Sequence, residues 1–175
     1  SIRHRHYWEI DIRKMKSLLS HSKGFTLVEV MVVIVLLTLS FMIFLQALNT
    51  AKEVRAKSEI RTIQSVILAS HQNLIRSKQF DENLNWPWSL DLGQDPGEIS
   101  VNDFNDVDDF KGYQVDALDN YPSFGCNIEV DYVTPETGFH EPVLDQVTNF
   151  KRITVSVNHS QLPSLVDTII IGKGL

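Results

Sequence analysis

One apolar run near the start of the chain limits its possible folds more than any other feature. Between Phe25 and Leu48 the only charged side chain is Glu29. A helix rises about 1.5 Å per residue, so a helix of this length covers the hydrocarbon core of a bilayer. Apolar residues occupy every face of that helix, which favours lipid or an all-apolar neighbour over a half-wetted surface. The sequence therefore predicts a membrane-spanning helix over residues 25–48.

Glu29 is the costly residue of this run. A carboxylate at mid-bilayer costs about 2.5–3.5 kcal/mol on insertion scales, and such residues usually serve a function. Its place in the first turn gives a partial reason, because a negative charge there faces the positive end of the helix dipole. That argument does not favour Glu over Ser, so a second reason is needed.

The residues around Glu29 supply one, because residues 24–29 read Gly-Phe-Thr-Leu-Val-Glu between a basic leader and the apolar run. This motif resembles the class III signal of type IV prepilins and type II secretion pseudopilins. The resemblance implies that prepilin peptidase cleaves the Gly24–Phe25 bond and methylates the nitrogen of Phe25. It also implies that Glu29 pairs with the amino terminus of a neighbouring subunit. Opposite charges attract strongly in a low-dielectric helix bundle, which agrees with that role.

An ordinary secretory signal peptide fits less well. Its apolar core spans about 7–15 residues and ends at a small-x-small site, whereas this run is longer and residues 45–47 make a poor site. Basic residues flank both ends of the run, so the family resemblance, not charge, places residues 1–24 in the cytoplasm as a cleaved leader. Met15 would give a compact leader, and we predict that it is the true start.

The helix pattern continues beyond the membrane run, because no Pro or Gly occurs from Asn49 to Gln79. Four apolar residues at spacings of three, four and seven form one stripe: Ile60, Ile63, Ile67 and Leu74. The helix is then stopped by Asp81, Asn83, Asn85 and Pro87. We predict one helix over residues 25–79, lipid-facing first and amphipathic afterwards.

An irregular acidic region follows over residues 86–120. Four of its aspartates are candidate calcium ligands, because Ca²⁺ prefers carboxylate oxygens: Asp103, Asp106, Asp108 and Asp109. The EF-hand pattern fails here, since Val107 occupies the third ligand position and no Gly follows. Two interpretations stay open, a calcium site or a solvated, turn-forming or helix-capping acidic surface. No other metal or cofactor is predicted.

The last third of the chain is strand-like. Apolar and polar residues alternate over residues 126–132 and 153–158, and residues 165–171 are more continuously apolar. These runs predict an antiparallel meander whose apolar face is covered by the helix stripe. The predicted fold class is α+β, a type IV pilin-like ladle with a long N-terminal helix packed against a C-terminal antiparallel sheet. Its globular head comprises residues 80–175.

Charge and residue content argue against two classes of function, nucleic-acid binding and catalysis. Residues 25–175 carry 10 basic and 20 acidic side chains, which argues against sequence-independent binding to nucleic acid. Cys126 is the only cysteine, so no intramolecular disulfide forms, and its alternation with Ile128 and Val130 indicates a small buried hydrophobe. Three of the histidines, His71, His140 and His159, are far apart and lie in no metal or nucleophile motif, so we predict no enzyme.

The resemblance to pilins gives the functional prediction. Many major pilins have a disulfide-bounded loop that this chain lacks, which favours a minor pilin or pseudopilin. In addition, residues 102–113 and 150–157 are similar to the head of MSHA-type minor pilins of the MshD kind. The expected partners are prepilin peptidase, other pilin subunits, an inner-membrane assembly platform and the membrane. The head would lie in the periplasm and later in a pilus or pseudopilus, or at the cell surface. Retention of Glu29 favours a shaft or sub-tip position.

Two hypotheses from other classes stay open beside this one. A single-pass membrane anchor with a sensory or ligand-binding head would keep its leader and stay monomeric. An anchored hydrolase would need an activity that depends on a particular head residue.

Overall fold

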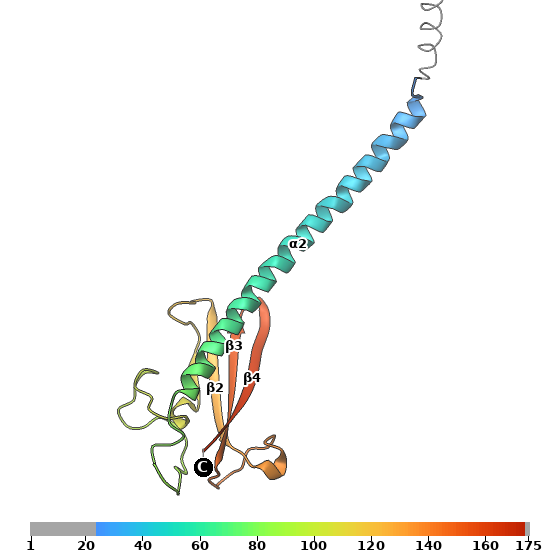
Figure 1. Cartoon of the computed structure of the whole chain (residues 1–175). Coiled ribbons are helices and arrows are strands. Elements are labelled where there is room, and N and C mark those ends of the chain that lie inside the picture. The colour runs from blue at the N-terminus through green and yellow to red at the C-terminus, as the bar shows by residue number, and fades with distance from the viewer. Residues whose placement is uncertain (1–23, 174–175) are drawn as a thin grey trace, which may run out of the picture. The chain divides into compact units, whose positions relative to one another are not determined.

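The structure is a computed structural model that describes residues 24–173 (Figure 1). The predicted start at Met15 and most of the predicted leader lie outside the described residues. The chain forms two compact units, one ending at Ala51 and the other beginning at Lys52, and each is described by itself. One long helix, α2 (Leu27–Arg76), contributes residues to both.

The first described unit is the apolar part of α2. Every residue from Gly24 to Ala51 is exposed, and the helix is long and apolar enough to cross a membrane. Figure 1 shows this part as an unbroken helix, coloured blue to cyan. A helix that is apolar on all faces and uncovered by its own chain needs lipid or other apolar helices around it.

The α2 helix ends at Arg76, three residues earlier than the sequence predicts. The N–H of Ser77 donates to the carbonyls of both Asn73 and Leu74, and the N–H of Lys78 donates to the Ile75 carbonyl. These short-range bonds tighten the last turn, as at many helix ends. The chain then turns so that Phe80 and Asp81 become buried.

The second unit contains a four-stranded sheet. Its strands are β1 (Tyr113–Val115), β2 (Phe124–Tyr132), β3 (Phe150–His159) and β4 (Leu162–Gly172), in the order β1-β2-β3-β4. All neighbours pair antiparallel, which confirms the predicted meander. The connections contain two short 3₁₀ helices, η1 (Asp108–Phe110) and η2 (Pro135–Thr137). The sequence analysis missed β1, because three residues are too few to show an alternating pattern.

The C-terminal part of α2 packs on one face of the sheet and forms the core. Ile67, Leu68 and Ile75 of α2 are buried in one cluster with the inward-facing residues of β2 and β3. The predicted stripe is confirmed, since Ile60, Ile63 and Leu74 also pack against this cluster while partly buried. Helix-on-sheet packing in an α+β pilin-like arrangement is therefore the fold of this chain.

A buried glutamine fixes how α2 lies on the last two strands. Gln64 is fully buried, and its Nε2 donates to the carbonyl of Val157 at 3.0 Å. The β3–β4 register is interrupted between Val157 and His159, where this amide reaches the strand. Arg61 Nη1 in turn donates to the Gln64 side-chain oxygen at 3.1 Å. A satisfied buried amide tolerates little sliding, so this contact sets the helix position along the sheet.

Candidate processing and assembly site

The motif over residues 24–29 forms the beginning of α2. Thr26 caps the helix, because its Oγ1 accepts the backbone N–H of Glu29 at 3.2 Å and its carbonyl accepts the N–H of Val30. Thr26 and Glu29 thus occupy the Thr-x-x-Glu positions of a capping box. The dipole and the pairing implied by the family resemblance were the two reasons found for Glu29 in the sequence, and the capping positions of Thr26 and Glu29 were missed there although both residues are visible.

Gly24 lies just before the cap in open space. A Cβ added at Gly24 meets no atom within 4 Å, and its φ lies outside the left-handed range that favours glycine. The described part of the chain therefore does not itself require glycine at this position. Phe25 is 78% exposed, so the Gly24–Phe25 bond is open to an enzyme.

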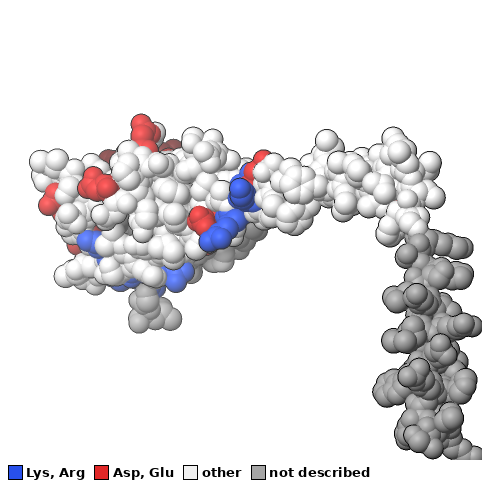
Figure 2. Space-filling model, turned by 90° about the horizontal axis from the view of Figure 1, so that it is seen from above, with Lys and Arg blue, Asp and Glu red and all other residues white. Residues whose placement is uncertain are grey.

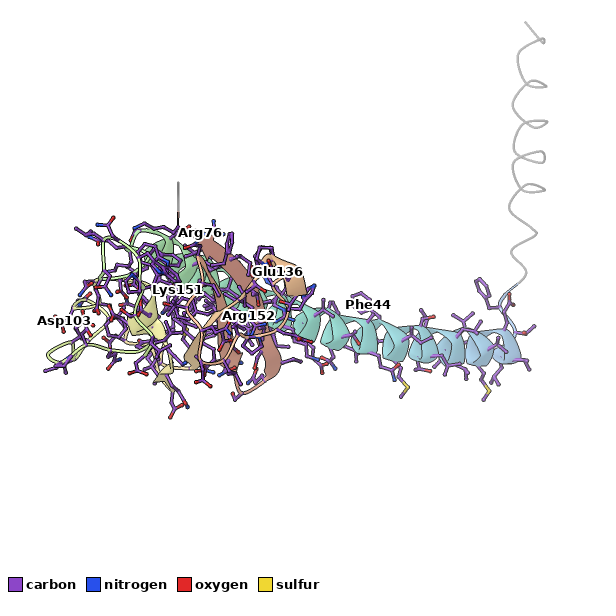
Figure 3. All side chains as sticks on the ribbon, turned by 90° about the horizontal axis from the view of Figure 1, so that it is seen from below. Phe44, Arg76, Asp103, Glu136, Lys151 and Arg152 are labelled. Carbon is purple, nitrogen blue, oxygen red and sulfur yellow. The ribbon has the colours of Figure 1, made fainter. Side chains whose placement is uncertain are left out.

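The surface that follows is apolar and uncovered. Large apolar side chains from Phe25 to Leu48 are exposed, and the labelled Phe44 projects from α2 without a neighbour in Figure 3. On the face shown in Figure 2 this stretch of the helix is white, with no charged side chain in view. An exposed apolar surface of this extent marks a membrane or helix-packing segment.

Comparison with protein families decides what the segment is. Residues 19–45 match the family model described as the prokaryotic N-terminal methylation motif. The segment is a class III, type IV prepilin-like signal. No curated protein and no solved structure matches the chain. The similarity of the head to MshD-like minor pilins stays a prediction, because the match ends at residue 45.

The four calcium candidates divide into two kinds. Asp103 is exposed, lies at the loop edge in Figure 3, and its Oδ2 accepts hydrogen bonds from Ile99 and Ser100. The other three, Asp106, Asp108 and Asp109, are buried and do not form the solvated surface considered above. Within residues 24–173 no group of three or more His, Cys, Asp or Glu is arranged to hold a metal.

Asp106 and Asp109 instead hold the turn that leads into η1. Asp106 Oδ1 accepts the N–H groups of Asp108 at 2.9 Å and Asp109 at 3.4 Å. Asp109 Oδ2 accepts those of Asn105 at 2.8 Å and Asp106 at 3.0 Å. The turn-forming interpretation therefore describes these two aspartates.

Asp108 belongs to a buried charge cluster around Lys151, which Figure 3 places inside the head. Lys151 is fully buried on β3, and its Nζ lies 2.7 Å from Asp108 Oδ1 and 3.1 Å from Asp81 Oδ2. The same nitrogen donates to the Phe80 carbonyl at 2.7 Å, and the Phe80 and Tyr132 rings lie nearby. The cluster joins the turn after α2, η1 and the sheet through one ammonium group.

Opposing causes set the carboxyl pKa values in this cluster. Burial alone would raise the pKa of Asp81, but hydrogen bonds from the Asn83 and Ser89 N–H groups and the Lys151 charge outweigh it and lower this pKa. Burial and the neighbouring Asp108 carboxyl raise the pKa of Asp106 to about 8. At neutral pH Asp106 is therefore largely protonated in the folded head.

Replacing Asp106 by Asn should make stability less dependent on pH. Asp106 releases its proton near pH 4 when unfolded but near pH 8 when folded, so its stabilising contribution is complete below pH 4 and is lost as pH rises to 8. Asn keeps the acceptor oxygen but has no proton to release. From pH 5 to 7.5 the stability of Asp106→Asn relative to wild type should rise, by at most about 1.4 kcal/mol per pH unit. Chemical denaturation of the detergent-solubilised chain measures this, and parallel pH profiles would contradict it.

Cys126 behaves as a buried hydrophobe. It is fully buried on β2, and burial raises the pKa of its thiol to about 11. A protonated, buried thiol is unreactive, which agrees with the prediction from the alternating pattern.

Proposed function

We propose that this chain is a minor pilin or pseudopilin, a structural subunit inserted in the inner membrane and then packed by its N-terminal helix into a type IV pilus or type II secretion pseudopilus. The observation that carries the proposal is the methylation motif at the start of an uncovered apolar helix. Neighbouring helices of the same kind could cover such a surface in a filament as lipid does in the membrane.

The proposed sequence of events is supported by the methylation motif and by the exposed start of α2. Prepilin peptidase cuts the exposed Gly24–Phe25 bond and methylates the new amino terminus at Phe25. The assembly platform then moves the helix from lipid into a bundle of other pilin helices, with the head on the periplasmic side. Bond cleavage is performed by the peptidase, and this chain serves as substrate and building block.

Glu29 has a role in the second step. In lipid its carboxylate is costly, while the capped first turn and the helix dipole relieve part of that cost. A methylated amino terminus on an adjacent subunit offers the missing positive charge. If two neighbouring helices are shifted along their axes, the Glu29 carboxylate stays buried without a partner. The ion pair would therefore select one axial register between the two helices.

Replacing Glu29 by Gln tests this role. Gln fits the capping position but has no charge. We expect cleavage at Gly24–Phe25 to be unchanged and the amount of the subunit in sheared filaments, measured by immunoblot in the native host, to fall at least about tenfold, the equivalent of about 1.4 kcal/mol. Glu136→Gln, at an exposed position of η2 in the head, is the control for loss of an acidic side chain and should assemble normally. Normal assembly of Glu29→Gln would remove the pairing role.

A further inference from the structure

Charge is divided unevenly along the exported part of the chain. Residues 79–150 contain a single basic side chain, Lys111, and 16 acidic ones, all outside the buried set except four: Asp81, Asp106, Asp108 and Asp109. Residues 52–78 of the same subunit contain six basic and two acidic side chains. A subunit with two oppositely charged surfaces is complementary to other copies of itself, and such complementarity guides and orients association.

The longest continuously exposed part of this segment is a bare stretch of α2, residues 52–59, here named the basic collar, with three basic and two acidic side chains. Every residue in it is exposed, so the head does not cover it on any side. Arg55 is engaged by Glu59 at 3.1 Å, whereas Lys52 and Lys57 have no ion pair within residues 24–173. Val54 is 61% exposed and lies three residues before Lys57, on the same helix face. The collar thus offers an apolar side chain beside an unengaged cation.

The acidic surface contains a crevice between two loops, here named the acidic crevice. It has a volume of about 220 Å³ and is lined by residues 90–92 and 142–146, with Lys111, Asp131 and Tyr132. Its apolar walls are open to solvent, since Leu90 is 62% and Leu144 is 79% exposed. Asp131 is neutralised by Arg152 at 2.8 Å, which leaves Asp91 and Asp145 as exposed carboxylates among its lining residues.

We propose that the acidic crevice of one copy receives the basic collar of a second copy. Val54 would enter between Leu90 and Leu144 while Lys57 pairs with Asp91. Two different surfaces meet in this contact, so it is heterologous and leaves one free surface at each end, which is the symmetry of an open filament and not of a closed dimer. The inference rests on the proposed filament function and adds a contact between heads and collars to the packing of apolar helices.

Disulfide trapping between full-length chains in native-host membranes tests the contact. One copy carries Val54→Cys and a second, differently tagged copy carries Leu144→Cys, so that Lys57 and Asp91 both keep their charges; the native Cys126 is buried and does not interfere. After mild oxidation we expect a dimer that contains both tags, and several-fold less of it when salt rises from 0.05 to 0.5 M. Gln114→Cys in place of Leu144→Cys is the control, because Gln114 is an exposed position of β1 outside the crevice.

The mass of the N-terminal peptide, measured on the same samples, distinguishes a failure of the proposed contact from a failure of the proposed pilin function. If the chains begin at methylated Phe25 but trapping is no greater than with the Gln114 control, the contact is overturned and the pilin function stands. Specific trapping of chains with an uncut leader would support the contact and overturn the proposed function. A charge swap gives a second readout: Asp91→Lys should abolish trapping between Leu144→Cys and Val54→Cys, and Lys57→Glu on the partner copy should restore it. Failure of that rescue counts against the ion pair.

Discussion

Replacing Lys151 by Met should destabilise the head by about 3–5 kcal/mol, the usual cost of removing one partner from a buried ion pair. Met fills much of the same volume, so the loss comes from charge and not from a cavity. Asp81 and Asp108 would stay buried without their shared cation, and the Phe80 carbonyl would lose its donor. Denaturant unfolding of the full chain in detergent, followed by tryptophan fluorescence, measures the change, since Trp88 lies in the adjoining cluster.

Two further variants give this prediction its controls. Lys111→Met removes an exposed lysine of the same head and should change stability by less than about 0.5 kcal/mol. Adding Asp81→Asn and Asp108→Asn to Lys151→Met should recover part of the loss, because neutral amides are less costly to bury than unpaired carboxylates. A Lys151→Met head as stable as wild type would show that the three groups are not coupled as the structure places them.

Replacing Gly24 by Val should abolish maturation without disturbing the fold. The space around Gly24 is open in the described chain, so any defect must arise in the peptidase that recognises the residue. We expect essentially all of the variant to keep its leader in the host, detected as a heavier band by immunoblot and confirmed by mass. A Val substitution at Gly93, a loop glycine of the head, is processed normally in this account, although its φ of 144° makes that variant strained.

A mature Gly24→Val protein would contradict the assignment of the cleavage site. An uncut variant that also loses its folded head would leave a folding explanation, so near-UV circular dichroism of the purified chain accompanies the blot. We expect the same spectrum as that of uncut wild-type chain.

The fold was largely predictable from periodicity. The alternating runs over residues 126–132 and 153–158 lie within β2 and β3, and the stripe on α2 packs on the sheet. The burial of Gln64 was not predictable. A polar residue beside an apolar stripe does not indicate that its side chain will donate to a carbonyl of a distant strand, here that of Val157. The α2 end was placed three residues late because residues 77–79 carry no Pro or Gly, and the short-range backbone bonds that close the last turn have no sequence signal.

The site was predictable where it depends on local sequence. Residues 24–29 show the signal without any structure, and the family comparison bears out its class. The buried charge cluster could not be predicted from the sequence. Lys151 lies 70 residues after Asp81 and 43 residues after Asp108 in the chain. Aspartates between regular elements are usually solvated, and only the fold shows that four of them are enclosed: Asp81, Asp106, Asp108 and Asp109. A cluster assembled from distant residues has no sequence spacing to recognise.

The most direct test of the central claim is the mass of the N-terminal peptide of the wild-type protein, purified from its own host's membranes. We expect a peptide that begins at Phe25 and is heavier by one methyl group at its amino nitrogen, with the segment up to Gly24 absent. A peptide that still contains the leader, or one that begins at another residue, would contradict it. The chain would then be a single-pass anchor that carries its head to the membrane without entering a filament.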